Sequence, residues 1–398
     1  MRMRPCELSV QRLPQQKGRV DVAIPFVHLA DVHLGRLQAG GLSSEQVAQR
    51  RLDALMTLRR CLERVQEAQI PLLLVAGDLF EHDTVPKSTV LEVRDFLGDL
   101  TRTKVFIAAG NHDFAASDSF YRTLQWPDNV HLFLGDWESV RVDELDLTMH
   151  GCGFSEPESA IPVLREYVAG DGAAVGLHVV LLHADYVAGG ASTSAYCPVC
   201  QADLESVGAD YVALGHLHTP QLLWQVDGRV RAAYSGALEP VTFSEEGTHG
   251  YFVGELGQGG ARLDLVPAAA RQYRRLYVDI SAMDTMERVS EAAQRMLADV
   301  PQTDLVRLVI CGERQPDLEL DHSRLQELGG DQFAFFVRDE TVVAYDLESL
   351  AQGYSARAVF VQRLRSRLEE ATPEEEPLLR QALKMGLDAL AGREVRLP

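Results

Sequence analysis

The sequence predicts a mixed α/β and α+β protein, with a large amino-terminal domain followed by a smaller α+β domain. Three observations predict this class. Buried-strand patterns alternate with helical patterns over the first 115 residues, short strands with Gly-rich turns fill 220–266, and strands and a helix resume after the PAAARQ segment at 267–272. A chain of 398 residues is long enough for two or three domains.

The first strands and helices follow directly from hydrophobic patterning. Continuous apolar runs are typical of strands buried on both faces, and helices show apolar residues three or four positions apart. On these grounds we expect strands at 22–30, 71–78 and from 104, with helices at 44–69 and 86–100 between them. Ser43 or Ser44 could cap the first helix.

The middle of the chain changes from long apolar runs to short, partly alternating strands. We expect strands at 130–134, 139–142 and 145–154, a loop and helix at 156–170, a buried strand at 177–185, a helix at 201–207, a buried strand at 210–218, and short antiparallel strands within 220–266.

The last third predicts a small α+β domain and a helical tail. Strands are expected at 273–280, 305–311 and 333–337, and helices at 284–298, 356–369 and 377–391. The predicted organisation is therefore a disordered or extended leader at 1–20, a first domain at 21–268, a second at 269–345 and a helical segment at 346–398.

Composition limits the setting of the protein. The six cysteines are mostly scattered and do not suggest a disulfide framework. The apolar runs are shorter than the roughly 20 residues that span a bilayer, and no apolar segment follows the basic N-terminus. We therefore expect a cytoplasmic protein without a membrane association. Its net charge is −20, so a nucleic-acid substrate would need a local basic groove or a partner that supplies one.

Seven side chains that could bind metal stand at the ends of five predicted strands. Because DVH places an acid and a histidine two residues apart, both would face one ion if the backbone were extended. A carboxylate after a glycine could bridge two ions. The candidate ligands are Asp31, His33, Asp78, Asn111, His183, His216 and His218.

This ligand set indicates a centre with two divalent cations. Mixed nitrogen and oxygen ligands suit Mn, Fe, Zn or Ni and disfavour Ca or Mg. Two such ions about 3.5–4 Å apart can activate a water and clamp phosphoryl oxygens. His112 follows the candidate ligand Asn111, so we expect it to face the substrate and protonate the leaving oxygen, oriented by Asp113 or Glu81.

These residues resemble the calcineurin-like metallophosphoesterases, whose motifs here are Asp31-Val32-His33, Gly77-Asp78, Gly110-Asn111-His112-Asp113, His183 and Gly215-His216-Leu217-His218. The resemblance implies two mixed β-sheets packed face to face with helices outside. It also implies one ion held by Asp31, His33, Asp78 and His218, and another by Asp78, Asn111, His183 and His216.

The phrases HLADVHLG, LLLVAGDLFE, IAAGNHD, DYVALGHLHTPQ and YSGALEP resemble the DNA repair exonucleases of the SbcD type. That resemblance implies manganese, a DNA substrate, a capping domain at 269–345 and a coiled-coil SMC-like ATPase partner for the C-terminal helices. A homodimer is a further expectation. SbcD-type nucleases commonly have a substrate-handling histidine where this chain has Glu81; either His82 replaces it or Glu81 pairs with His112.

Two further features have alternative interpretations. Cys197 and Cys200 form a single CxxC, which predicts a surface turn with free thiols or, less simply, a redox or zinc role. Arg50, Arg51, Arg59, Arg60 and Arg64 lie on one predicted helix, which indicates a solvated helix face or a contact with the DNA backbone.

Three functions remain open from the sequence. The first is a Mn-dependent DNA exo/endonuclease acting in DNA repair with an ATPase subunit. The second is a small-molecule phosphodiesterase or phosphatase that uses the same dimetal site, which the acidic charge favours. The third, a regulatory subunit with an inactive site, is disfavoured because the ligand set is complete.

Overall fold

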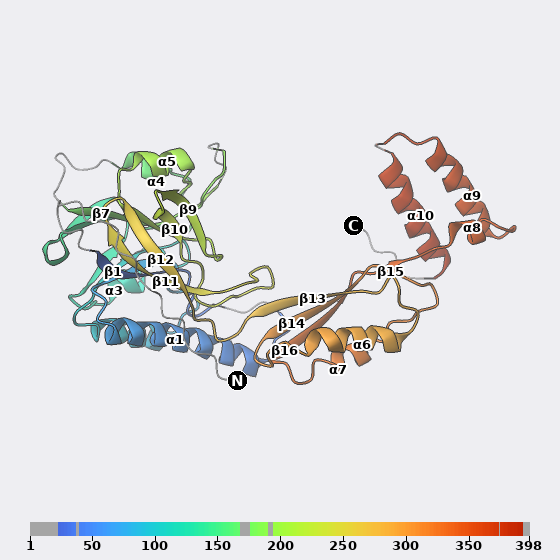
Figure 1. Cartoon of the computed structure of the whole chain (residues 1–398), viewed down its shortest axis with the longest axis horizontal. Coiled ribbons are helices and arrows are strands. Elements are labelled where there is room, and N and C mark those ends of the chain that lie inside the picture. Colours follow the sequence, from blue (N-terminus) through green and yellow to red (C-terminus); the bar gives the residue numbers. More distant parts are fainter. Residues whose placement is uncertain (1–22, 37–39, 168–175, 190–193, 374, 393–398) are drawn as a thin grey trace, which may run out of the picture. The chain divides into compact units, whose positions relative to one another are not determined.

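The computed structural model describes residues 23–36, 40–167, 176–189, 194–373 and 375–392. The chain divides into two compact units, Met1–Tyr273 and Arg274–Pro398 (Figure 1). The predicted leader at 1–20 lies outside the described residues, and the domain boundaries drawn from the sequence stay predictions.

The first unit contains the strands β1 (Ile24–Leu29), β2 (Leu72–Ala76), β3 (Lys104–Ala108), β4 (Val130–Phe133), β5 (Glu138–Val142), β6 (Leu147–Gly151), β7 (Leu177–His183), β8 (Tyr211–Gly215), β9 (Gln221–Val226), β10 (Arg229–Tyr234), β11 (Gly250–Gly257) and β12 (Gly260–Pro267). Its helices are α1 (Ser44–Glu67), α2 (Lys87–Gly98), α3 (Phe120–Thr123), α4 (Val163–Glu166) and α5 (Gln201–Ser206), with a 3-10 turn, η1 (Asp143–Leu145). The strands and the helices α1, α2 and α5 confirm the expectations. The helix expected at 156–170 is confined to α4 among the described residues.

The strands form one hydrogen-bonded sheet in the order β4-β3-β2-β1-β11-β12-β10-β8-β7-β6-β5, with β9 paired to β10. Among the described residues, the paired residues that join its two halves are Val230 of β10 and Ala261 of β12. Strands β2 and β3 contact β7 and β8, so the halves face one another. The expected pair of packed sheets is therefore present, as one sheet folded over at a single residue pair.

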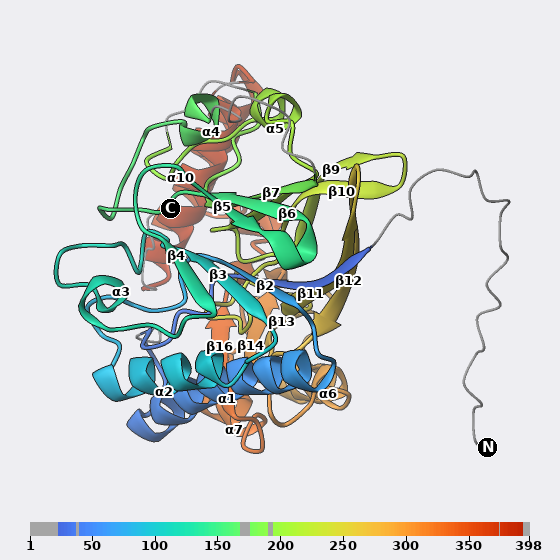
Figure 2. The same ribbon diagram turned by 90° about the vertical axis from the view of Figure 1, so that its left-hand side faces the viewer.

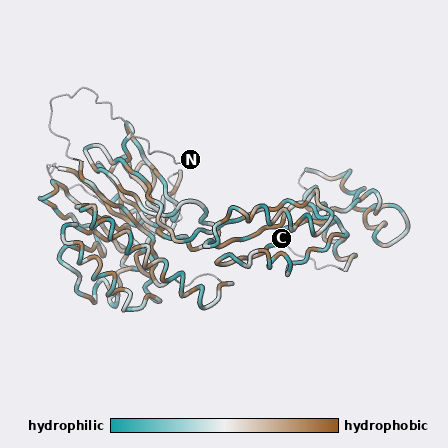
Figure 3. Tube along the Cα trace, turned by 60° about the horizontal axis from the view of Figure 1, so that its bottom comes forward, coloured by the Kyte–Doolittle hydropathy of each residue, from teal (hydrophilic) through white to brown (hydrophobic). Residues whose placement is uncertain are grey.

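Side-chain alternation produces the layers of this unit. In β2, Leu72 and Leu74 point into the core between the sheet halves, whereas Leu73 packs beneath α1 and α2. In β7, Leu181 points into the same inner core and Leu182 packs on the other side, with residues of α4 and α5. Figure 2 shows α1 and α2 on one side of the folded sheet and α4 and α5 on the opposite side. Strands β2 and β8 are buried along their whole length, and brown segments run through the middle of this unit in Figure 3, as burial on both faces requires.

Helix α1 starts where the sequence allowed two choices. Ser43 is the N-cap: its side chain accepts from the Gln46 amide while the Gln46 side chain accepts from the Ser43 amide, which is a capping box. The expectation that all five arginines of this helix are solvated or free for DNA is wrong for Arg50, which is 2% exposed.

The second unit contains the strands β13 (Tyr273–Asp279), β14 (Leu305–Cys311) and β16 (Ala334–Asp339) in one sheet, and β15 (Glu313–Arg314) paired with β17 (Val342–Val343). Its helices are α6 (Met286–Leu297), α7 (His322–Glu327), α8 (Leu347–Leu350), α9 (Ala356–Glu369) and α10 (Glu376–Leu390). The predicted strands and long helices are confirmed, whereas α7, α8 and the short pair β15–β17 were not expected. In the part of the chain described, no helix has the length and apolar character needed to cross a membrane.

Candidate metal centre

The candidate ligands lie at one edge of the folded sheet because the strands that carry them run parallel. Strand β1 is parallel to β2, β2 to β3, and β7 to β8. Each ligand cluster begins at the carboxyl end of its strand; His183 is the last residue of β7. Parallel strands bring these ends to the same edge, which is why clusters far apart in sequence converge.

The backbone at the ligands differs from the extended conformation that the DVH spacing suggested. Asp31 and His33 both have φ of 51°, Asp78 has 52° and His216 has 115°. Left-handed backbone is uncommon for residues other than glycine and occurs at functional sites where the surroundings enforce it. Here the Asp31 amide donates to the Gly77 carbonyl at 3.1 Å, and the His33 amide donates to the Asp78 carbonyl at 2.9 Å.

Gly77 is required in this arrangement. Its φ is 87°, and a Cβ atom at this position would lie 2.4 Å from Nδ1 of His183. The glycine therefore permits both the turn after β2 and the close approach of His183.

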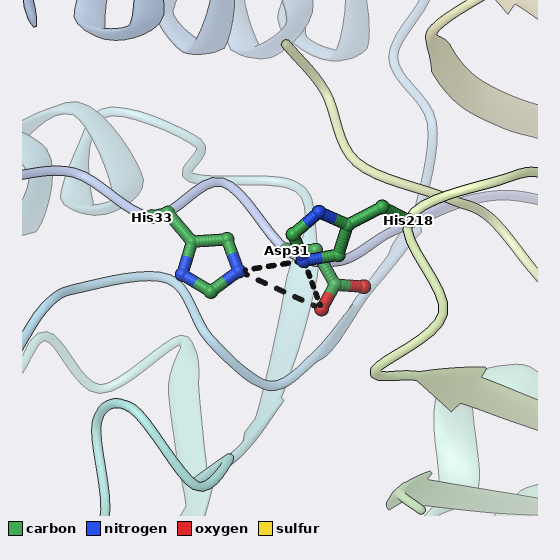
Figure 4. A group of neighbouring side chains, drawn as sticks. All are labelled: Asp31, His33 and His218. Atoms are coloured by element: carbon green, nitrogen blue, oxygen red, sulfur yellow. Dashed lines mark hydrogen bonds and ion pairs between the residues drawn. The ribbon is translucent and has the colours of Figure 1, made fainter. Parts of the chain in front are cut away.

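The first group of ligands is Asp31, His33 and His218 (Figure 4). The two Nε2 atoms of His33 and His218 are 3.0 Å apart, and each is 3.9 Å from Oδ1 of Asp31. The Asp31 carboxylate also accepts from the His216 amide, at 3.1 Å to Oδ2, which ties the end of β1 to the end of β8.

The second group adjoins the first through Asp78. Nε2 of His183 lies 3.0 Å from Oδ1 of Asn111, and Nδ1 of His216 lies 3.3 Å from the same oxygen. Oδ2 of Asp78 is 3.4 Å from Nε2 of His183 and 3.6 Å from Nε2 of His33. One carboxylate oxygen thus stands between the two groups.

Contacts behind the imidazoles fix which nitrogen faces the centre. Nδ1 of His33 is 2.9 Å from Oε1 of Glu81, Nδ1 of His218 is 3.2 Å from Oε1 of Glu245, and Nδ1 of His183 is 2.9 Å from the Ala76 carbonyl. A neutral imidazole carries its proton on the nitrogen that faces an acceptor, so the Nε2 atoms of these histidines offer lone pairs to the centre.

This donor set fits divalent cations. If both imidazoles are neutral with the proton on Nδ1, His33 and His218 direct two lone pairs at one another across 3.0 Å, and a cation beside them would relieve the repulsion. Although burial opposes it, the contact with Glu245 raises the pKa of His218, so a proton on its Nε2 atom would relieve the same repulsion without an ion. Ligand atoms about 2.1 Å from a common ion lie roughly 3.0–3.4 Å apart at angles between 90° and 109°. The separations within the second group, 3.0, 3.3 and 3.4 Å, fall in that range. In the first group the 3.0 Å between His33 and His218 does, whereas Oδ1 of Asp31 is 3.9 Å from each of the two histidines.

Burial gives the same indication. Burial lowers the pKa of His33 to about 3 and lowers that of His183, so both are neutral bases. Burial raises the pKa of Asp31, and burial together with the neighbouring Asp113 raises the pKa of Asp78 to about 8. These two buried carboxylates can ionise near neutral pH only if positive charge lies beside them, and cations would supply that charge.

His112 lies beside the centre and is more accessible than the ligands. Its side chain is 40% exposed, and its Nδ1 is 2.9 Å from Oε2 of Glu81. The hydrogen bond to Glu81 raises the pKa of His112. Although burial opposes it, the hydrogen bonds from His112 and His33 lower the pKa of Glu81 to about 2, so one carboxylate holds both imidazoles.

The other two candidate orienting residues have different contacts. Asp113 is buried and accepts from the backbone amides of Leu79 and Gly110, at 2.7 and 2.6 Å, and from the Tyr121 hydroxyl at 2.7 Å. The Nε2 atom of His82 lies 3.6 Å from Asp118, and its ring packs on Phe114. Of the alternatives left open by the sequence, the structure therefore shows the pairing of Glu81 with His112.

Cys197 and Cys200 are both free thiols. The expectation of a surface turn is wrong for Cys197, which is 5% exposed and has φ of 44°. Burial raises its pKa to about 11, which disfavours the reactive thiolate.

Comparison with known proteins agrees with this geometry. Residues 24–220 match the family model described as calcineurin-like phosphoesterase. The uncharacterized metallophosphoesterase YhaO of Bacillus subtilis is 24% identical over 302 residues, which cover 73% of this chain and 72% of that protein.

Two archaeal relatives are similar at comparable levels. The DNA double-strand break repair protein Mre11 of Methanopyrus kandleri is 28% identical, over 59% of this chain and 54% of that protein. The Mre11 protein of Aeropyrum pernix is 27% identical, over 69% and 68%. A solved dimetal phosphatase from Danio rerio aligns with a TM-score of 0.37 and 13% identity over 61% of this chain and 99% of its own, a level at which no function is inferred.

Residues 24–220 therefore belong to the calcineurin-like metallophosphoesterase superfamily and have that fold. Members of this superfamily are metal-dependent phosphoester hydrolases. Among the described residues, the groups that could hold a metal ion are Asp31, His33 and His218; His33, Asp78 and His112; and Asp31, Asp78 and His183.

Proposed function

We propose that this protein is a two-metal DNA phosphodiesterase, an exo/endonuclease of the SbcD type that acts in DNA repair in the cytoplasm. The observation that carries the proposal is the position of Asp78, whose Oδ2 atom lies 3.6 Å from Nε2 of His33 in one group of candidate ligands and 3.4 Å from Nε2 of His183 in the other. The two Mre11 relatives, which are DNA double-strand break repair proteins by name, support DNA as the substrate.

In the proposed mechanism Asp31, His33, Asp78 and His218 would hold one ion, and Asp78, Asn111, His183 and His216 would hold the other. When bound, the two ions lower the pKa of a water and offset the charge of the phosphoryl oxygens. We propose manganese, with iron, zinc or nickel as alternatives.

His112 is the proposed general acid. Glu81 holds its Nδ1 atom, which leaves Nε2 to donate a proton to the leaving oxygen. Because the hydrogen bond to Glu81 raises the pKa of His112, more of it is protonated near neutral pH.

An SMC-like ATPase is the proposed partner, bound through the C-terminal helices. Helices α9 and α10 pack on one another through Val361, Leu383 and Leu387. Leu378 and Leu390 remain 69% and 45% exposed, which leaves apolar surface for a coiled coil. A partner would also supply positive charge that this acidic chain lacks.

The test is degradation of linear DNA with manganese, by the chain alone and with its copurified partner. We expect cleavage that chelation abolishes and that Asp78→Ala lacks. Absence of cleavage in both preparations would refute the nuclease proposal.

The second candidate is a small-molecule phosphodiesterase or phosphatase at the same centre. The net charge of −20 favours it, because a polyanion approaches an acidic surface less readily than a small ester does. Hydrolysis of a chromogenic diester without cleavage of DNA would select this alternative.

A further inference from the structure

The loop that joins β10 to β11 touches both the metal centre and the helix layer. At one end Glu245 contacts the candidate ligand His218, and at the other Glu239 is buried beneath α1. The phrase YSGALEP covers the first part of this loop, up to Pro240 and including Glu239. Glu245 lies beyond that phrase and is not one of the predicted ligands.

Glu245 is held on both of its oxygens. Oε1 lies 3.2 Å from Nδ1 of His218 and accepts from the Thr242 hydroxyl at 3.1 Å, while Oε2 accepts from the Val241 amide at 2.9 Å. A carboxylate fixed in this way can hold the imidazole in one orientation and increase the basicity of its Nε2 atom.

Glu239 anchors the other end of the loop. It is 3% exposed and accepts from Nη1 of Arg50 at 3.0 Å, from the Thr57 hydroxyl at 2.6 Å and from the Ala270 amide at 2.6 Å. Nη2 of Arg50 donates to the Pro240 carbonyl at 2.8 Å, so the guanidinium binds both the side chain and the backbone of the loop.

Such an anchor makes the loop rigid. A buried ion pair is stable only while its partners and hydrogen bonds are all in place, so a displaced loop would leave charges buried without partners. The same contacts therefore restrict where Glu245 can lie, six residues further along the chain.

We propose that Glu245 is a positioning residue for His218, and that the buried pair of Glu239 and Arg50 holds it in place from α1. The inference rests on the proposed dimetal centre and not on DNA as the substrate. Glu245 should affect only the ion that His218 would bind, because other groups contact the ligands of the second ion.

The first experiment titrates the full chain with manganese. Binding is measured by calorimetry and by the electron paramagnetic resonance signal of the unbound ion. Wild type should bind two ions. Glu245→Ala should weaken one of them by about 10–100-fold and leave the other unchanged. Glu255→Ala is the matched control, because it removes the same charge from an exposed position on β11 and should change neither ion.

Glu245→Gln tests the same point with less risk to folding. Its amide oxygen can still accept from His218 or from the Val241 amide, but not from both. We therefore expect the affinity for this ion to lie between that of wild type and that of the alanine variant.

The second experiment removes the anchor as a pair. Arg50→Met combined with Glu239→Gln deletes both charges of this pair together. Asp53, which lies 3.4 Å from Arg50, keeps its contact with Arg271 at 2.7 Å. We expect the same ion to bind severalfold more weakly although Glu245 is intact. Unchanged affinity in a folded double variant would overturn the role of the anchor.

The outcomes separate this inference from the proposed function. If Glu245→Ala and Glu245→Gln bind both ions as wild type does, or lose both equally, Glu245 has no selective positioning role. If wild type binds two ions and shows the selective loss but cleaves no DNA, the nuclease proposal fails and the positioning role stands.

Discussion

The two groups of ligands in the metal centre are supported in different ways. His33 and His218 are backed by the carboxylates of Glu81 and Glu245, which come from loops. His183 is backed by the main-chain carbonyl of Ala76 at the end of β2. A main-chain carbonyl in a buried strand is fixed by the sheet and cannot be removed by a substitution, whereas a side-chain carboxylate can. The first group should therefore be the more sensitive of the two to mutation.

Asp78 belongs to both groups and gives the largest expected effect. Asp78→Ala should lose both ions and reduce kcat by at least about 10³-fold, because the carboxylate that lies beside His33 and His183, and its charge, disappear together. Metal content by elemental analysis and turnover of a diester are the measurements. Retention of one ion at full affinity would show that the two groups are independent.

His112 is in neither predicted ligand set, although one of its ring nitrogens lies within 4.8 Å of ligand atoms of His33 and Asp78. Its substitution therefore tests whether chemistry separates from ion binding. His112→Ala should keep both ions and lower kcat by about 10²–10⁴-fold, the usual contribution of a general acid. The manganese titration and the kinetics are compared in the same preparation. Loss of metal equal to that of Asp78→Ala would contradict this division of roles.

Glu81 supports His33 in the first group and also holds His112. Glu81→Ala should weaken one ion by about 10–100-fold. It should also lower kcat at saturating manganese, because Nδ1 of His112 loses its acceptor. A variant in which saturating manganese restores full kcat would show that Glu81 acts on the ligand alone.

The comparison also explains what could be predicted from the sequence. The strand ends were predictable because β2 and β7 are continuous apolar runs, and a run that stops at a polar residue marks the edge of a sheet. The conformation after them was not, because the left-handed backbone of Asp31 and His33 depends on hydrogen bonds to Gly77 and Asp78. No local pattern encodes a bond between loops so far apart in the chain.

The residues that support the ligands were harder still to predict. Glu245 lies in a loop well after His218, and Arg50 looks like one more arginine on a polar helix. Their roles follow from packing: Arg50 is buried by Glu239 and Pro240, and Glu245 is placed by the turn at Val241 and Thr242. Only the folded chain brings these groups together.

Asp113 supports the turn that carries Asp78. Its substitution should have the smallest effect on the difference between the two ligand groups, because it should change the stability of the fold and not the affinity for one ion over the other. Asp113→Asn leaves one acceptor oxygen where the carboxylate has two, so an amide N–H of Leu79 or Gly110 is left buried without its bond. We expect the free energy of unfolding to fall by about 1–3 kcal/mol, measured by urea denaturation.

Tyr121→Phe is the matched control for that substitution. It removes only the hydroxyl that donates to Asp113 and keeps both carboxylate oxygens for the backbone, so unfolding should become easier by about 1 kcal/mol. Folded samples of both variants should bind the two ions either with unchanged affinity or with an equal loss of affinity for each ion, because the turn at Asp78 serves both groups of ligands. If Asp113→Asn lost affinity for one ion alone, the turn would position Asp78 toward one ligand group. The difference between the two groups would then depend on the Asp78 carboxylate and not on whether a carboxylate or a backbone carbonyl backs each histidine.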